Sequence, residues 1–335
     1  MWRYSERGST FPYRPLPITI AGAPGVLVVG FSVNGSGSAQ TLTPTALRRD
    51  GSVAWQRTFS GRSVVLAHRS TDLPFFNGVL RSASGDTHLL IKLTSSAQNV
   101  RTTQSLVLNG ITGQELSRTT ETVAQGGSPQ PTAVGDLNGE GRADYVVASA
   151  ENNARLTAYN AVNGAQLWRT TGVPLDFFGA QPPQPFDAGD VDRDGRPDLL
   201  FPLGFNTLLV DGRTGAVRWK RAGQGSLRVG DISGDGTDEV VAATTQSLFA
   251  GNAFTFELRH TAHDLAGNLR YDAVRQQPVP TDGFNEFEPP LIFSIAAGDV
   301  NADGVGDITN NLSIRLQACN GLGCKGSPTA STPPC

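Results

Sequence analysis

Short, mostly apolar runs recur along this chain, and each has the length of a β-strand. Examples are D-Y-V-V-A-S at 144–149 and D-L-L-F-P-L at 198–203, and residues that favour turns separate such runs throughout the sequence. No long stretch shows the 3.6-residue periodicity of an amphipathic helix, and the 39 Gly and 21 Pro fit strands joined by turns. The pattern predicts an all-β protein.

The predicted strands follow one another in a repeating order. From Pro131 an entering strand is followed by an acidic loop, an apolar strand, and two further strands that end with L-W-R-T-T at Thr171. The acidic loops of three such segments begin at Asp136, Asp190 and Asp231, which are 54 and 41 residues apart. Four short strands at this period predict the blades of a β-propeller.

The repeating order predicts six blades, with seven as the alternative if 260–290 contains a degenerate one. The six are expected at about 18–60, 75–120, 131–172, 186–223, 227–260 and 294–318. Residues 1–5 match the fourth-strand ends and are expected to complete the last blade, which closes a propeller of residues 1–318. Residues 261–293 are expected to form an insertion loop, and 319–335 a flexible tail that contains cysteines.

Four loops share one spacing of polar side chains. Oxygen-bearing side chains occupy positions 1, 3, 5 and 9, and the glycine at position 6 suits a sharp reversal of the chain. Such oxygens converge on one point and repel one another, which favours calcium, a hard cation with many oxygen ligands. The sequence predicts up to four structural Ca²⁺ ions, with candidate ligands at positions 1, 3, 5, 7 and 9: Asp136, Asn138, Glu140, Arg142 and Asp144; Asp190, Asp192, Asp194, Arg196 and Asp198; Asp231, Ser233, Asp235, Thr237 and Glu239; Asp299, Asn301, Asp303, Val305 and Asp307.

Two of the loops depart from the strongest copy. Glu140 is longer than the aspartate usual at position 5, Ser233 is a weak ligand, and Glu239 replaces aspartate at position 9. The loops that begin at 136 and 231 are therefore weaker candidates than those that begin at 190 and 299.

These residues resemble known repeat families. The G-D-x-D-x-D-G-x-x-D loop followed by an apolar strand resembles the FG-GAP/VCBS repeats of integrin α-chain propellers and of many bacterial surface proteins. The T-G-x-x-x-W ends, as at Thr214, Gly215 and Trp219, look like the repeats of quinoprotein-type and BamB-like propellers. Together the two resemblances cover roughly residues 1–318. They imply loops that join the first two strands of a blade and hold structural calcium.

Charge and compartment follow from the predicted ions. Four divalent ions would add eight charges and change the formal net charge from −3 to +5, so acidic partners such as anionic glycans become more plausible. Calcium loops of this type favour an extracytoplasmic site, which is secreted, periplasmic or at the cell surface. No apolar run is long enough to span a bilayer, and residues 1–17 lack the apolar core of a signal peptide.

Few other residues suggest chemistry. Trp55, Trp168 and Trp219 recur at one place in the repeat, so they are expected to pack blades rather than to bind sugars. His260 and His263, where the expected insertion loop begins, lack an identifiable catalytic partner, but this loop is the best candidate for contact with a ligand. Cys319, Cys324 and Cys335 lie in the tail, where the first two either form a disulfide or are incidental thiols.

The sequence favours a calcium-stabilised extracellular propeller that acts as a binding or adhesion module for a glycan or protein partner, as part of a longer surface protein. The alternatives are a propeller enzyme, either polysaccharide lyase-like or quinoprotein-like, and an envelope-assembly scaffold. No catalytic residues, no cofactor besides Ca²⁺ and no nucleic-acid recognition motif are identified.

Overall fold

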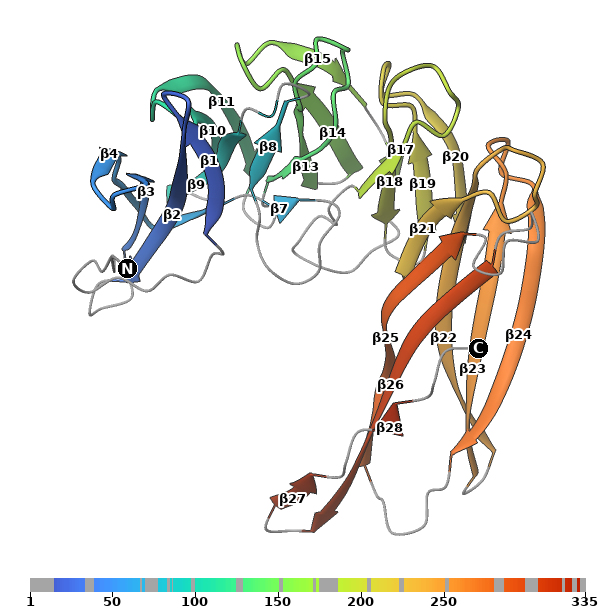
Figure 1. The fold of residues 1–335 in the computed structure, drawn as a ribbon. Helices are drawn as coiled ribbons and strands as arrows, with labels where there is room; N and C mark the ends of the chain where they lie inside the picture. Colours follow the sequence, from blue (N-terminus) through green and yellow to red (C-terminus); the bar gives the residue numbers. More distant parts are fainter. Residues whose placement is uncertain are drawn as a thin grey trace. The chain divides into compact units, whose positions relative to one another are not determined.

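The computed structural model describes residues 15–33, 39–66, 68–69, 78–82, 85, 87–97, 100–124, 129–150, 153–170, 173–174, 186–203, 206–222, 226–250, 253–279, 286–298, 307–320, 323–326 and 330–331 (Figure 1). Within these ranges every regular element is a β-strand, arranged in six sheets. No helix long and apolar enough to cross a membrane occurs in this part of the chain. The all-β class predicted from the sequence is confirmed.

The chain forms two compact units. The first comprises Met1–Asp187, Asp194–Gly204 and Val210–Val217, and the second comprises Ala188–Arg193, Phe205–Leu209 and Arg218–Cys335.

Three sheets of the first unit follow one another along the chain. The first has the order β1 (Leu16–Ile20), β2 (Ala23–Val33), β3 (Gln40–Arg48) and β4 (Val53–Gln56), with β5 (Phe59–Gly61) also paired to β3. The second has the order β6 (Ser63–Leu66), β9 (Thr87–Ala97), β10 (Val100–Asn109) and β11 (Glu115–Ala124), with β8 (Val79–Arg81) also paired to β9. The third has the order β7 (His68–Arg69), β12 (Gln130–Ala133), β13 (Tyr145–Ala150), β14 (Asn153–Tyr159) and β15 (Gln166–Arg169), with β16 (Val173–Pro174) paired to β14.

The remaining sheets repeat this arrangement. The fourth, which has segments in each unit, consists of β17 (Phe186–Gly189), β18 (Asp198–Leu203), β19 (Asn206–Val210) and β20 (Val217–Ala222). The fifth consists of β21 (Ser226–Gly230), β22 (Glu239–Ala250), β23 (Ala253–His263) and β24 (Leu269–Val279). The sixth consists of β25 (Glu286–Gly298), β26 (Asp307–Asn320) and β27 (Gly323–Gly326), with β28 (Ala330–Ser331) paired to β26.

In each sheet most neighbouring strands are consecutive in the chain, which is the arrangement of the blades of a β-propeller. The predicted class, all-β with four-stranded blades, is therefore confirmed by the chain's own sheets. Residues 1–5, the expected closing strand, lie outside the described residues, and the number of blades remains a prediction.

Residues of β23, β24 and β25 occupy parts of the expected insertion loop at 261–293. The strand β24 pairs with β23 from Phe254↔Val279 to His263↔Leu269, so the fifth sheet extends well beyond residue 260. The sequence of β24 mixes Arg, Asp and Gln with apolar residues and leaves Leu269 and Tyr271 exposed. An outer strand of this kind lacks the apolar run that identifies an inner strand, which is why the sequence did not indicate it.

The expected tail also contains strand residues. β27 and β28 lie within 319–335, and the antiparallel register of β26 and β27 places Cys319 opposite Cys324.

Apolar residues of β9 contribute alternately to two cores, one on each face of the second sheet. Leu89 and Ile91 belong to the core between the first and second sheets, whereas Leu90 belongs to the core between the second and third. The period of two in a strand sends consecutive side chains to opposite faces, so a fully apolar run can pack on both sides.

Tryptophans near the ends of sheets pack on a turn of the next sheet. The Nε1–H of Trp168 donates to the carbonyl of Gly212 at 2.6 Å, and the ring covers Gly215, where an added Cβ would lie 2.5 Å from it. Trp55 repeats this arrangement with Gly110 and Gly113.

Trp219, in the second unit, is also buried, and its ring lies 6.0 Å from the ring of His263. The predicted packing role of the three tryptophans is confirmed.

Candidate metal centre

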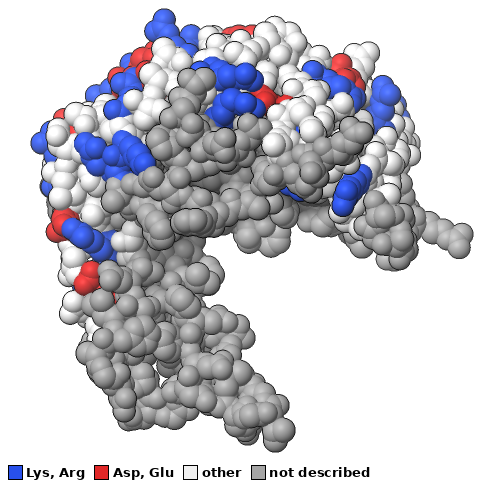
Figure 2. Space-filling model, turned by 180° about the vertical axis from the view of Figure 1, so that it is seen from behind, with Lys and Arg blue, Asp and Glu red and all other residues white. Residues whose placement is uncertain are grey.

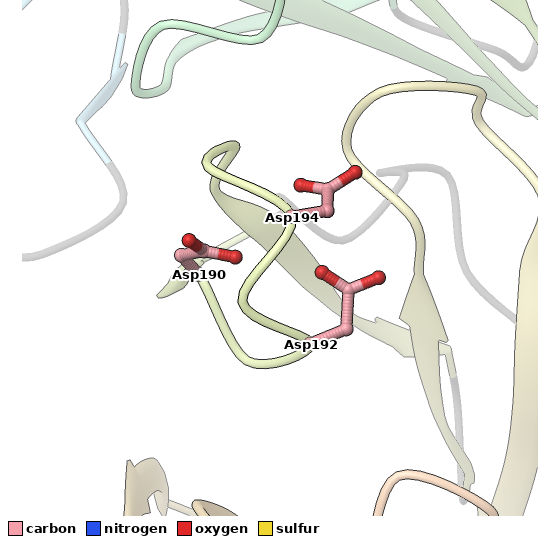
Figure 3. Close-up of side chains that lie close together, drawn as sticks. All are labelled: Asp190, Asp192 and Asp194. Carbon is pink, nitrogen blue, oxygen red and sulfur yellow. The ribbon is translucent and has the colours of Figure 1, made fainter.

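Three aspartates of the loop between β17 and β18 have side chains that lie close together. Asp190, Asp192 and Asp194 occupy alternate positions, and each offers one carboxylate oxygen such that these oxygens all lie within 4.8 Å of one another. Figure 3 shows the three side chains around the curve of this loop. Carboxylates held so close repel one another unless a cation or a basic side chain compensates their charge.

A second group shares Asp192 and adds residues that lie later in the chain. Oxygens of Asp192, Asp198 and Asp211 are also within 4.8 Å of one another. Asp198 begins β18 and is 2% exposed, and its Oδ1 accepts the N–H of Gly212 at 3.1 Å. Asp211 follows β19 and was not among the residues predicted from the sequence.

Positive backbone φ angles shape this loop. Arg193 at position 4 has φ of 61° and Gly195 at position 6 has φ of 86°. The other described loops have glycine at both positions, with positive φ at Gly139, Gly141, Gly234 and Gly236. Two left-handed residues tighten the turn, so the side chains at positions 1, 3 and 5 can face one region.

The arginines around the loop have different partners. Arg218 on β20 forms an ion pair with Asp192, which compensates part of the negative charge. The guanidinium of Arg196 lies directly against Gly139 in the loop of the preceding sheet, in the space that an added Cβ would occupy. Arg142, at the equivalent position 7, forms a β-bridge with Ser82.

In the loop that begins at 136, backbone N–H groups bind the oxygens. The carboxylate of Asp136 accepts the N–H groups of Gly139, Glu140 and Gly141 at 2.6, 3.1 and 2.6 Å. The Oδ1 of Asn138 accepts the N–H of Glu140 at 3.1 Å. These bonds fix the turn from within.

Asp144, the position 9 residue of this loop, is fully buried. It accepts the N–H of Leu137 at 3.1 Å and that of Ala161 at 3.2 Å. Burial raises the pKa of Asp144 to about 7; the two N–H groups oppose the rise, and the nearby Glu140 and Asp136 add to it. A bound cation would favour the ionised form.

The loop that begins at 231 is also closed by internal hydrogen bonds. Asp231 accepts the N–H groups at positions 4 and 6 at 2.7 and 2.8 Å, and Asp235 accepts the N–H of Thr237 at 2.8 Å. The buried Glu239 accepts a hydrogen bond from the hydroxyl of Ser233 at 2.9 Å, so these two candidate ligands bind each other.

The described loops differ in how closely their acidic side chains lie to one another. Among the described residues, groups of three acidic side chains within 4.8 Å occur in the loop of 190–198 together with Asp211, and not in the loops that begin at 136 and 231. Asp299, Asn301, Asp303 and Val305 lie outside the described residues, as does the side chain of Asp307.

The loop of 190–198 fits a hard cation best. Its donors are carboxylate oxygens from several residues, which is the ligand type that calcium prefers. Asp190, Asp192, Asp194, Asp198 and Asp211 would hold such an ion.

Comparison with known proteins gives a family for this region. Residues 136–201 match the family described as FG-GAP-like repeat. A search of curated proteins found no match.

Solved structures with a similar arrangement include BamB from Moraxella catarrhalis, at 12% identity over 98% of this chain and 91% of that one, with a TM-score of 0.40. The WD40 domain of SCAP from fission yeast is 7% identical over 94% of this chain and 86% of that one, with a TM-score of 0.37. The SapL1 lectin in complex with alpha methyl fucoside is 13% identical over 96% and 97%, with a TM-score of 0.33. These TM-scores are low, and the fold is defined here by the chain's own sheets.

The sheets and their loops define an all-β repeat protein of the β-propeller type. The match of residues 136–201 to the FG-GAP-like repeat agrees with the resemblance of the acidic loops to such repeats.

Proposed function

We propose that this chain is a calcium-stabilised extracellular β-propeller that acts as a binding or adhesion module. The observation that carries the proposal is the group of carboxylates in the loop of 190–198, which lies within the FG-GAP-like repeat. A cation there offsets the repulsion between the carboxylates, so its binding free energy adds to the stability of the fold. Calcium concentrations that suit such a site are found outside the cytoplasm, which supports an extracytoplasmic location.

Hydrogen bonds from the backbone help to hold the loops that begin at 136 and 231. Asp136 and Asp231 accept two or more backbone N–H groups each, so these loops hold their shape through backbone donors. The loop of 190–198 carries more carboxylates in close contact and is proposed as the strongest calcium site.

Basic residues are scattered along the sequence, which favours a glycan or protein partner over a nucleic acid. On the face in Figure 2, Lys and Arg side chains form several separate groups, with Asp and Glu between some of them. Binding to a nucleic acid backbone typically uses one continuous basic surface.

Equilibrium dialysis with calcium tests the metal site directly. We expect Asp190→Asn and Asp194→Asn each to weaken calcium binding at least about tenfold, because each removes a charged ligand. Asp238→Asn, the same chemical change at position 8 of another loop, should bind like the wild type. Equal binding by all four proteins would contradict the assignment of the site.

A glycan array probed with the calcium-loaded protein tests the binding role against an enzymatic one. Retention of a glycan without chemical change supports a binding module. Release of a cleaved product would contradict the proposal and favour a propeller enzyme.

A further inference from the structure

A groove of about 400 Å³ opens in the first unit, where the chain passes from the first sheet to the second. Residues 58–62, which include β5, line the groove. It is also lined by residues 93–95 of β9, Gln104 of β10 and Arg118 of β11. The size lies within the range of about 300–1,000 Å³ that is usual for small-molecule sites.

Part of the groove is apolar. Phe59 and Leu93 are partly buried and pack against the core between the two sheets, and both also line the groove. Leu93 pairs directly with Gln104 across β9 and β10, so these two side chains lie on the same face of the sheet. An apolar surface thus adjoins an amide group.

Polar groups surround this surface. Arg118 donates to the Oε1 of Gln104 at 2.7 Å and binds the carboxylate of Glu115 through two hydrogen bonds of 2.9 Å. These contacts orient the amide of Gln104 so that its Nε2 can donate to a ligand. Because Glu115 balances the charge of Arg118, the excess positive charge comes from Arg62, which is exposed at the groove.

We propose that this groove binds an acidic saccharide, one that bears a carboxylate or a sulfate. A sugar ring has an apolar face, which suits Phe59 and Leu93, and hydroxyl groups at its edge, which suit Gln104 and the hydroxyl side chains of the groove. Its acidic group pairs with the guanidinium of Arg62, which binds such planar or multi-oxygen anions through parallel hydrogen bonds. The inference rests on the proposed binding function and specifies its ligand and its site.

Calorimetric titration of the full calcium-loaded chain tests the groove. The probes are an oligogalacturonate, a sulfated galactan oligosaccharide and a neutral galactan oligosaccharide of equal length. We expect at least one acidic probe to bind at least about tenfold more tightly than the neutral one, as expected for a charge-assisted hydrogen bond. Whichever acidic probe binds more tightly identifies the anion.

Variants locate the site. Arg62→Gln should weaken binding of the acidic probe at least about fivefold, because it removes the charge but keeps a polar group. Ser95→Trp should abolish binding by filling the groove. Arg213→Gln, which removes an exposed arginine elsewhere, should leave affinity unchanged, and the melting temperature of each variant is compared with that of the wild type.

The outcomes separate the two proposals. Wild-type affinity in both Arg62→Gln and Ser95→Trp would overturn the groove as the site while leaving a binding function intact. Failure of the wild type to bind either acidic probe would overturn the inference as a whole. The proposed calcium-stabilised module is contradicted by a different result, the absence of a calcium effect on stability.

Discussion

Arg193 is the residue at which the loop of 190–198 departs from the pattern of the other loops. Its φ of 61° lies in the left-handed region, where Gly139 and Gly234 occupy the equivalent positions of the other loops. The left-handed conformation costs a residue with a Cβ about 1–2 kcal/mol.

We expect Arg193→Gly to raise the free energy of unfolding by about 1 kcal/mol, because glycine adopts this conformation without strain. Urea denaturation measures the change. Arg213→Gly is the matched control, since Arg213 is not among the described residues with positive φ and should gain no stability. A lower free energy of unfolding in Arg193→Gly than in the wild type would contradict the claim that the backbone is strained at Arg193.

Lys92 is a buried base whose charge depends on pH. It is 9% exposed, its Nζ donates to the Oε1 of Gln130 at 2.6 Å, and burial, with a contribution from Arg101, lowers its pKa from 10.5 to about 8. Between these values the unfolded chain binds more protons than the folded one. The free energy of unfolding should therefore rise as the pH increases from about 8 toward 10.

Replacement of Lys92 by methionine should remove this rise, which is on the order of 2–3 kcal/mol for a shift of this size. Urea denaturation at several pH values between about 7.5 and 9.5 measures the slope. Lys220→Met serves as a control and should keep the rise of the free energy of unfolding with pH. An unchanged slope in the Lys92 variant would show that another group is responsible.

Residue spacing predicted the acidic loops but not every member of the candidate site. The separation of Asp190, Asp192 and Asp194 by two residues each was sufficient to predict their convergence. Asp211 joins only through pairing of β18 with β19, which spacing within one loop cannot show. Its signal was the first position of the D-G-R-T-G turn, whose last glycine packs on Trp168.

Among the elements, the tryptophan-to-turn contact is a link between sheets that occurs at both Trp55 and Trp168. We expect Trp168→Phe to lower the free energy of unfolding by about 1–3 kcal/mol, because the buried carbonyl of Gly212 loses its donor. Trp55→Phe should cost less, since its bond to Gly110 is longer, at 3.2 Å, and is only partly buried. Chemical denaturation of both variants measures the difference, and an equal or larger loss in Trp55→Phe would contradict this explanation.

Strands buried on both faces were recognisable from sequence, whereas outer strands were not. β13 and β18 are continuous apolar runs after an acidic loop, and they lie where the pattern predicted. β24 pairs on one side with β23 and exposes Val274 and Tyr271, so its mixed composition resembled a loop. Cross-strand pairing between distant segments, rather than local pattern, defines such a strand.

For the whole molecule, closure of the propeller by residues 1–5 remains a prediction. Deletion of these residues should lower the thermal midpoint by several degrees, because an unpaired edge and an incomplete blade would remain. Trp2→Ala should produce much of the same loss, and Arg3→Ala little of it. Differential scanning calorimetry measures the midpoints, and a midpoint unaffected by the deletion would contradict closure.

Calcium links the charged loops to the stability of the whole molecule. Filled loops would reverse the formal net charge of −3, and each ion would favour the folded state in proportion to its occupancy. Stabilisation by calcium can therefore be measured even though the glycan or protein partner is not identified.

The most direct measurement is the thermal unfolding midpoint of the full chain in calcium and in excess chelator. Saturating calcium should raise the midpoint by roughly 4 °C for each ion bound, since an ion at about a hundred times its dissociation constant contributes about 2.7 kcal/mol. Asp190→Asn should lose most of the rise, and Asp238→Asn should keep it. Identical wild-type midpoints in calcium and in chelator would contradict a calcium-stabilised propeller.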